Sequence, residues 1–332
     1  LASPSVTAVS LEVQSSGPLP LTDVGGPVRS PVELGYTIAP IPDVRAAVMQ
    51  EGDALSWVDM RQAEQGLFPP LASPPAALPP VPAAYSGLAV SPDGAELAAV
   101  PAGGAELVRW HARNRLPTPA IGPGLVPPTF DGTGRLWAVG AGPSGARVWC
   151  FEPGNPNGAA EVVEAPWLAG RTPVAIAVSR DATRVAVISR TAVDVRLDVA
   201  GIVRDTSGRP RSLAVPYRQG EALAQMLDVV WLDDVSLVVL GAEKAIDPLR
   251  PFGVDLGQGI GLRGLGPADQ RAALPPVPGA RALTAGSTMR SVIVTNEANA
   301  VLVRPSTAWR PLDQATGFVT APTGLAGPGR PR

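Results

Sequence analysis

The sequence predicts an all-β fold, and three observations support this. A strand-turn-strand pattern recurs six times along the chain, at a spacing of roughly 40–55 residues. The composition is rich in turn-forming residues, with 36 Gly and 39 Pro among 332 residues, and only 17% of the residues are charged. Several segments are apolar on both faces, for example residues 238–240 and 292–294. Sheets of this kind must be covered on both sides, as in the blades of a β-propeller.

The clearest copy of the pattern is LAVSPDGAELAAV at residues 88–100. Two apolar runs flank Ser91-Pro92-Asp93-Gly94, which has the composition of a tight turn. Proline fixes φ at the first central position, Asp can accept bonds from nearby amides, and Gly tolerates a positive φ. The stretch therefore predicts a β-hairpin.

Aligned on the second strand, the six units each contain three predicted strands. They lie at 36–39, 45–49 and 55–60; 88–90, 96–100 and 106–111; 128–130, 136–139 and 147–151; 175–178, 185–188 and 193–199; 227–232, 236–240 and 252–256; and 282–284, 291–295 and 301–304. A weaker outer strand is expected at 161–164, 212–217 and 309–312. This repeated strand pattern predicts a β-propeller of six blades, each with four antiparallel strands. A β-sandwich would lack the repeated three-strand unit.

The ends of the chain are expected to lie outside the blades. Residues 1–24 contain a strand-like stretch at 5–13, which either closes the ring or ends an upstream domain. Residues 25–320 form the predicted propeller, and 321–332 form a Gly/Pro-rich tail. Because the chain begins with Leu1, we expect it to be a processed or cloned fragment.

Composition argues against several classes of function. The net charge is −2 and no basic cluster occurs, so we expect no nucleic-acid partner. Cys150 is the only cysteine, which excludes a disulfide within the chain. No apolar run approaches the roughly 18 residues that a transmembrane helix requires. With one His and one Cys, a zinc site or a haem attachment is not expected, and we predict no cofactor or metal.

Candidate catalytic residues are scarce. His111 is the only histidine, so a Ser-His-Asp triad would have to use it, yet the chain has no nucleophile-elbow sequence. We therefore expect His111 to be a polar residue at a strand end and the protein not to be an enzyme. Five aspartates fall in the predicted hairpin turns, which favours a structural role in bonding their own backbone: Asp43, Asp93, Asp131, Asp181 and Asp233.

Three tryptophans occupy matching places in the third strands of the first three units. We interpret Trp57, Trp110 and Trp149 as packing residues between blades, the alternative being a stacking site for a ligand.

The connection at residues 241–253 (GAEKAIDPLRPFG) is the candidate partner site. It is much longer than the matching turn at 51–54, and it contains Lys244, Arg250 and Phe252. Long connections often carry function, and Arg and aromatic residues are enriched at the centres of protein interfaces. The alternative is that Phe252 packs on its own blade and the loop is an insertion.

The succession of motifs resembles a known family. SGLAVSPDGAELAAV at 86–100 is followed by PPTFDGTGRLWAVGAGPSGARVW at 127–149, PVAIAVSRDATRVAVI at 173–188 and VLVRPSTAWRPL at 301–312. Over roughly residues 30–328 the chain resembles the β-propeller domain of the actinobacterial lipoprotein LpqB. SLEVQSSGPLPL at 10–21 is similar to the last strand of the GerMN domain that precedes it. The chain departs from the family pattern in lacking the lipobox cysteine and most of the GerMN domain, and in having Ala182 where a turn glycine is usual.

The resemblance implies a protein held by a lipidated cysteine on the outer face of the cytoplasmic membrane. It also implies binding to the extracellular domain of the MtrB sensor kinase and modulation of two-component signalling in cell-envelope homeostasis. No catalytic motif of the family can be carried over. The alternative function is a carbohydrate-binding or hydrolytic propeller that acts at the central channel. The predicted innermost strands, which offer mainly Ala, Val, Leu and Thr, favour binding elsewhere.

Overall fold

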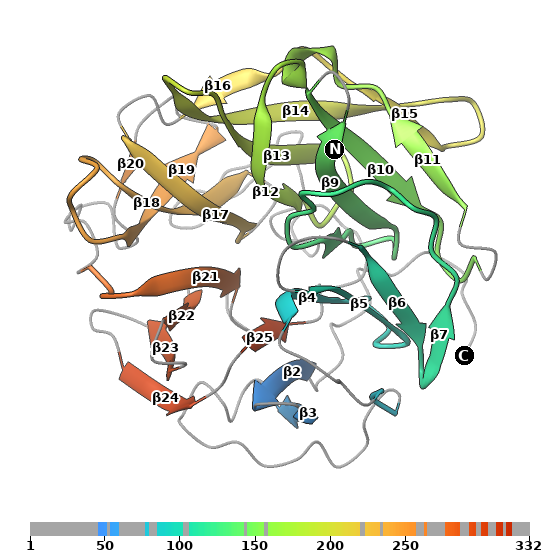
Figure 1. The fold of residues 1–332 in the computed structure, drawn as a ribbon, viewed down its shortest axis with the longest axis horizontal. Helices are drawn as coiled ribbons and strands as arrows, with labels where there is room; N and C mark the ends of the chain where they lie inside the picture. The colour runs from blue at the N-terminus through green and yellow to red at the C-terminus, as the bar shows by residue number, and fades with distance from the viewer. Residues whose placement is uncertain are drawn as a thin grey trace, which may run out of the picture.

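The structure is a computed structural model in which six antiparallel sheets form a ring (Figure 1). It describes residues 46–51, 54–59, 77–79, 85–101, 106–142, 145–155, 159–219, 223–232, 235–256, 262–263, 276–285, 292–296, 300–304, 310–314 and 317–320. The fold is the predicted all-β propeller of six blades. Among the described residues the helical content is the 3-10 turn η1 (Pro166–Leu168) and the single residue Leu256.

The first three blades have the following strands, from the innermost outward. Blade one contains β25 (Gly317–Thr320), β2 (Ala46–Glu51) and β3 (Ala54–Asp59). Blade two contains β4 (Tyr85–Val90), β5 (Glu96–Pro101), β6 (Val108–His111) and β7 (Asn114–Leu116). Blade three contains β8 (Thr129–Phe130), β9 (Leu136–Gly142), β10 (Gly145–Phe151) and β11 (Ala160–Val163).

The remaining blades follow the same order. Blade four contains β12 (Thr172–Val178), β13 (Arg184–Arg190) and β14 (Val195–Arg204), with β15 (Pro210–Leu213) and β16 (Tyr217–Gln219) both along β14. Blade five contains β17 (Gln225–Trp231), β18 (Ser236–Ala242), β19 (Arg250–Asp255) and β20 (Leu262–Arg263). Blade six contains β21 (Ala280–Ala285), β22 (Val292–Asn296), β23 (Ala300–Arg304) and β24 (Arg310–Gln314).

The ring is closed by the C-terminal strand. Each innermost strand contacts the next, in the cycle β4, β8, β12, β17, β21, β25 and back to β4 (Figure 1). β25 pairs with β2 through Val48 and Val319, and the other edge of β2 pairs with β3. Both edges of β2 are therefore occupied. Residues 36–39, which were predicted to pair with this strand, lie outside the described residues, and the inner edge of β2 is occupied by β25.

The terminal segments for which the sequence predicts a role also lie outside the described residues. This applies to the strand-like stretch at 5–13, to the rest of residues 1–24 and to the tail at 321–332. The predicted hairpins of blades two to six are confirmed, with strand ends shifted by a few residues. The predicted outer strand at 212–217 is instead two short strands, because β14 is long enough to pair with β15 at one end and with β16 at the other.

Apolar packing between neighbouring blades forms the core. The clusters of buried side chains each join two blades, and the largest, between blades four and five, includes Ile188, Leu197, Val239 and Phe252. Trp57 and Trp110 are buried in one such cluster and Trp149 in another, which confirms the packing interpretation of these side chains.

A β-bulge recurs near the start of the innermost strands. In blades two, four, five and six the register between the first and second strands shifts by one residue, at Tyr85/Gly87, Pro173/Ala175, Met226/Asp228 and Ala280/Ala282. A bulge bends its strand and increases the local twist, so the repeat curves each inner strand in the same way. In blade five the bulge lies between Met226 and Asp228.

We predict that β25 is required for stability. Truncation after Thr316 removes the strand that covers the inner edge of β2, whereas truncation after Thr320 leaves it in place. The shorter variant should lose on the order of 10 °C in melting temperature, since a loss of roughly 3 kcal/mol has that effect in a domain of this size. Circular dichroism melting of both variants provides the measurement, and equal melting temperatures would show that β25 does not close the ring.

Candidate functional site

The predicted partner loop is shorter than its sequence suggests. β18 continues to Ala242 and β19 begins at Arg250, so the connection proper is residues 243–249. Pro251 and Gly253 lie within β19, opposite Leu240 and Val238. A proline is tolerated there because, among the described residues, the outer strand β20 pairs with Gly253 and Val254 and no strand pairs with the outer edge of Pro251.

Phe252 lies inside the protein rather than on this surface. Its side chain is 3% exposed and packs in the cluster between blades four and five. The alternative considered from the sequence, that Phe252 packs on its own blade, therefore describes its position. The aromatic ring supports Arg250, whose guanidinium carbon lies 5.4 Å from the ring centroid.

The two basic residues of the candidate site are on the surface, in different settings. Arg250 is partly exposed and pairs with Glu243 across the connection, at 3.6 Å between Nη2 and Oε2. Lys244 is exposed, and among the residues that the structure describes it forms no ion pair. Arg250 is thus held in place from two sides, whereas the Lys244 ammonium group is available to a partner.

Backbone bonds fix the connection at several points. The Asp247 N–H donates to the Lys244 carbonyl at 3.1 Å, and the Val277 N–H donates to the Leu249 carbonyl at 2.9 Å. The Gln225 side-chain amide donates to the Ala245 carbonyl. Because Val277 belongs to the segment that leads into blade six, the connection is tied to both blades. An ordered loop loses little conformational entropy when it binds a partner.

The turn aspartates have the predicted structural role wherever they are described. Asp93 Oδ1 accepts the Ala95 N–H at 3.0 Å and the Ser91 hydroxyl at 2.6 Å. In blade four Asp181 bonds the Thr183 N–H and the Ser179 hydroxyl in the same way. Gly94 has φ of 73°, and Ala182, at the matching position, has φ of 59°. The alanine therefore adopts the left-handed conformation that the turn demands.

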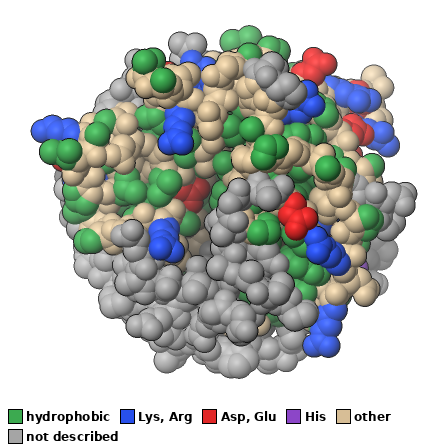
Figure 2. Space-filling model, viewed as in Figure 1, with side chains coloured by type: hydrophobic (Ala, Val, Ile, Leu, Met, Phe, Trp, Pro, Cys, Tyr) green, Lys and Arg blue, Asp and Glu red, His purple; other side chains and the backbone are tan. Residues whose placement is uncertain are grey.

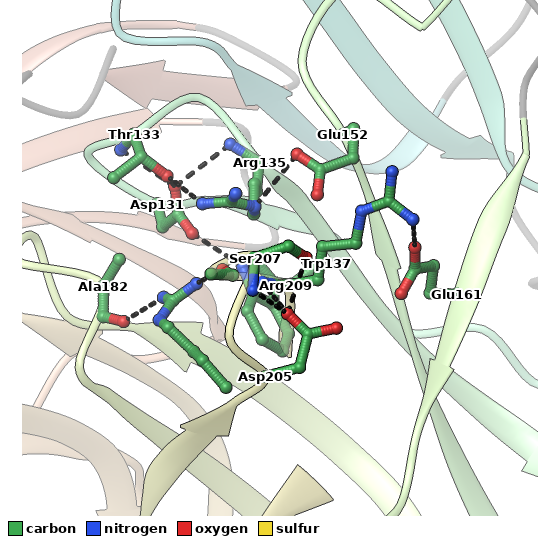
Figure 3. Close-up of polar contacts among 12 residues, drawn as sticks. Asp131, Thr133, Arg135, Trp137, Glu152, Glu161, Ala182, Asp205, Ser207 and Arg209 are labelled. Carbon is green, nitrogen blue, oxygen red and sulfur yellow. Dashed lines mark hydrogen bonds and ion pairs between the residues drawn. The ribbon is translucent and has the colours of Figure 1, made fainter. Parts of the chain in front are cut away.

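Asp131 has a variant of this role. In the turn between β8 and β9, Asp131 lies at the position that matches Ser91, which is two residues before the position of Asp93. Asp131 is fully buried. Its Oδ1 accepts the N–H groups of Thr133 and Arg135, and its Oδ2 accepts the Trp137 indole N–H at 2.9 Å (Figure 3). The carboxylate thereby joins the turn to the core of blade three.

A second turn with this arrangement joins β14 to β15. Asp205 Oδ1 accepts the N–H groups of Ser207 and Arg209, and Asp205 Oδ2 accepts from Arg211 (Figure 3). These bonds hold the pKa of Asp205 well below its usual range, the Ser207 hydroxyl being the largest cause. Arg209 and Arg211 also pair with Glu161 of β11, so ion pairs connect blades three and four at the rim.

His111 lies at the end of β6 and is exposed. Within the described part of the chain, no hydrogen bond or ion pair joins its ring to a nucleophile or a carboxylate. No group of three or more His, Cys, Asp or Glu that could hold a metal ion occurs among the described residues. Cys150 is buried, and this burial raises the pKa of its thiol far above the usual value, which makes the thiol unreactive.

Asp228 is a buried carboxylate that our sequence analysis did not single out. It lies on the innermost strand of blade five, where its Oδ1 accepts the Val229 N–H at 2.9 Å. Its Oδ2 accepts the Leu283 N–H of blade six at 2.7 Å. Part of the residue surface is exposed, but protein encloses the carboxyl group, and this burial raises the pKa of Asp228 to about 6. The signal in the sequence was a single acidic residue within an apolar inner strand, QMLDVVW.

The surface carries mixed charge. On the face drawn in Figure 2, basic side chains are scattered over the described part of the surface among hydrophobic groups and a few acidic ones. Within the described residues no helix has the length and apolarity needed to cross a membrane. A six-bladed ring whose described turns are short and polar defines a β-propeller module.

Comparison with known proteins identifies the family. Residues 74–323 match the family described as the lipoprotein LpqB beta-propeller domain, and the chain therefore belongs to this family. Membership indicates an extracytoplasmic protein associated with the membrane. No curated protein matches the sequence.

Solved structures support the fold alone. The chain is similar to TolB from Acinetobacter baumannii (14% identity, TM-score 0.53, 87% of this chain and 69% of TolB covered). It is also similar to the Kuenenia stuttgartiensis hydrazine synthase (14% identity, TM-score 0.52, 76% of this chain and 71% of that chain covered). A chain of the nidogen/laminin complex is similar as well (11% identity, TM-score 0.52, 85% of this chain and 100% of that chain covered). At such low identities these similarities indicate shared architecture and not shared function.

We predict that Asp228 makes stability depend on pH. Because its pKa is higher in the folded protein than in the unfolded chain, folding favours the protonated form, and stability falls as pH rises from about 4 to about 6. The free energy of unfolding should fall by about 2 kcal/mol over this range, since one pKa unit corresponds to about 1.4 kcal/mol. Urea denaturation of wild type and Asp228→Asn at several pH values measures this term. The difference between the two proteins should change by that amount, and parallel profiles would contradict the prediction.

Proposed function

We propose that this chain is a non-enzymatic binding module of a lipid-anchored protein on the outer face of the cytoplasmic membrane. Its partner is the extracytoplasmic part of a sensor histidine kinase similar to MtrB, and its binding modulates two-component signalling in cell-envelope homeostasis. Membership in the LpqB propeller family supports this proposal. A propeller is suited to such a role because a rigid ring presents its connections as fixed binding surfaces.

The observation that carries the proposal is the ordered connection between β18 and β19. It presents the exposed Lys244 and, at its end, Arg250, which Glu243 and the Phe252 ring hold in one orientation. A guanidinium group held in this way can form two parallel hydrogen bonds to a partner carboxylate. We propose Lys244 and Arg250 as contact residues, with Phe252 as their support within the core.

The test is titration of the kinase extracytoplasmic domain against wild type and single variants. Arg250→Ala should weaken binding by about 2 kcal/mol, as expected for a central contact, and Lys244→Ala by less. Arg115→Ala is the matched control, because Arg115 is an exposed arginine on the outer strand of blade two and, within the described residues, has one ion pair, to Glu106.

Unchanged melting temperatures must accompany each comparison, since Arg250 also contacts Phe252. Wild-type affinity in Arg250→Ala and Lys244→Ala would remove this connection from the binding site. Loss of binding in Arg115→Ala of the same size would show that the effect is not specific to the site. Failure of the wild-type chain to bind the kinase domain would contradict the proposed function itself.

A further inference from the structure

Two neighbouring hairpins each project one bare aliphatic side chain into solvent. Val193, in the turn between β13 and β14, is 93% exposed, and Ile246, in the connection between β18 and β19, is 90% exposed. Both turns join the second strand of a blade to its third. Because blades four and five are adjacent and have the same strand order, both turns emerge on the same face of the ring. We call residues 190–195 and 243–249 the two-hairpin surface.

Both hairpins are ordered by their own backbone. The Thr191 N–H donates to the Asp194 carbonyl at 2.8 Å, and the Asp247 N–H donates to the Lys244 carbonyl at 3.1 Å. These bonds hold the aliphatic tips outward. An isolated exposed valine or isoleucine needs no explanation, but two at matching positions on adjacent blades form a pair of anchors.

The charges around the tips are arranged asymmetrically. Two of the acidic residues are already neutralised: Asp194 pairs with Arg171 at 3.0 Å and Glu243 with Arg250 at 3.6 Å. Hydrogen bonds from Thr191 and Arg171 lower the pKa of Asp194, which keeps this pair charged.

Other charges on the surface have no such pairing. Arg190, Lys244 and the partly buried Asp247 form no ion pair within the described part of the chain. Counted together with Arg171 and Arg250, which pair with Asp194 and Glu243, the surface has four basic and three acidic side chains and therefore a net charge of +1, although the whole chain has a net charge of −2.

We propose that the two-hairpin surface rests on an anionic lipid bilayer. Val193 and Ile246 insert into the boundary between headgroups and acyl chains, while Arg190 and Lys244 lie at the level of the lipid phosphates. This arrangement excludes simultaneous contact of Lys244 with the kinase domain, so the bilayer and the kinase domain compete for this connection. Long basic side chains place their methylene stems against apolar surroundings and keep the charge in water, which suits this depth.

A bilayer is the occupant favoured by two observations. The chain belongs to a family of lipoproteins, so a membrane lies within its reach. The two apolar tips stand apart on separate blades, as inserted side chains do, instead of merging into the continuous apolar centre typical of a protein interface. A single acyl chain gives only marginal membrane binding and stable attachment needs a second signal, which this surface supplies.

The experiment uses vesicles and omits the kinase, so its outcome is separate from that of the proposed function. The chain without any acyl group is floated with vesicles of phosphatidylglycerol and phosphatidylcholine in equal parts, and with vesicles of phosphatidylcholine alone. Wild type should partition more strongly onto the anionic vesicles. Ile246→Ser should lower the partition coefficient about tenfold, in line with the loss of a buried aliphatic side chain.

Val193→Ser should have a similar effect, and Lys244→Ser should lower binding to anionic vesicles about fivefold without changing binding to the neutral ones. Val215→Ser is the matched control, because Val215 is 90% exposed but lies between β15 and β16 at the rim of blade four. It should bind as wild type does. Equal partitioning of wild type onto both kinds of vesicle, or equal losses in Val215→Ser and Ile246→Ser, would overturn the proposal.

Discussion

Apolar packing between blades is the constraint on which the rest of this structure depends. The second strands of the blades are buried on both faces: Val185, Ile188, Leu237 and Leu240 are fully inaccessible to solvent. A single four-stranded sheet cannot cover two such faces, so each blade requires a neighbour on either side. An open row of blades would leave an apolar face at each end. The closed ring removes both faces, and the return of the C-terminal strand β25 to blade one completes it.

The two faces of the ring are built differently. On one face, the turns between first and second strands direct their polar side chains back onto their own backbone, as Asp93, Asp131 and Asp181 do. These groups stabilise the fold and offer little to a ligand. On the opposite face, the connections between second and third strands that the structure describes throughout, those of blades four and five, carry exposed side chains, among them Lys244 and Ile246. Both functional proposals therefore concern the second face.

Local sequence patterns were sufficient to predict much of the fold. Turn chemistry such as Ser91-Pro92-Asp93-Gly94 acts within a few residues, so the hairpins of blades two to six could be recognised directly. The pairing of β2 with β25 could not, because it joins residues more than 250 positions apart and any apolar strand would fit the pattern. β7 was missed because Asn114–Leu116 is short and mostly exposed, and so has no apolar alternation.

The candidate site was predicted less well than the fold. Residues 241–253 were interpreted as one long connection, whereas β18 continues to Ala242 and β19 begins at Arg250. Phe252 was therefore expected on the surface although it belongs to the core. Asp228 was overlooked because its significance depends on Leu283, an amide in the next blade that no local pattern reveals. Val193 and Ile246 likewise become a pair only once the order of the blades is known.

Native-state hydrogen exchange tests the closed ring most directly. If packing on both sides stabilises every blade, the amides that pair β2 with β25 open only when the whole propeller unfolds. Their protection should then equal that of the amides pairing β13 with β14 on the far side of the ring. Rapid exchange at Val48 and Val319, together with full protection at Val187 and Asp198, would show that blade one opens independently and would contradict this account.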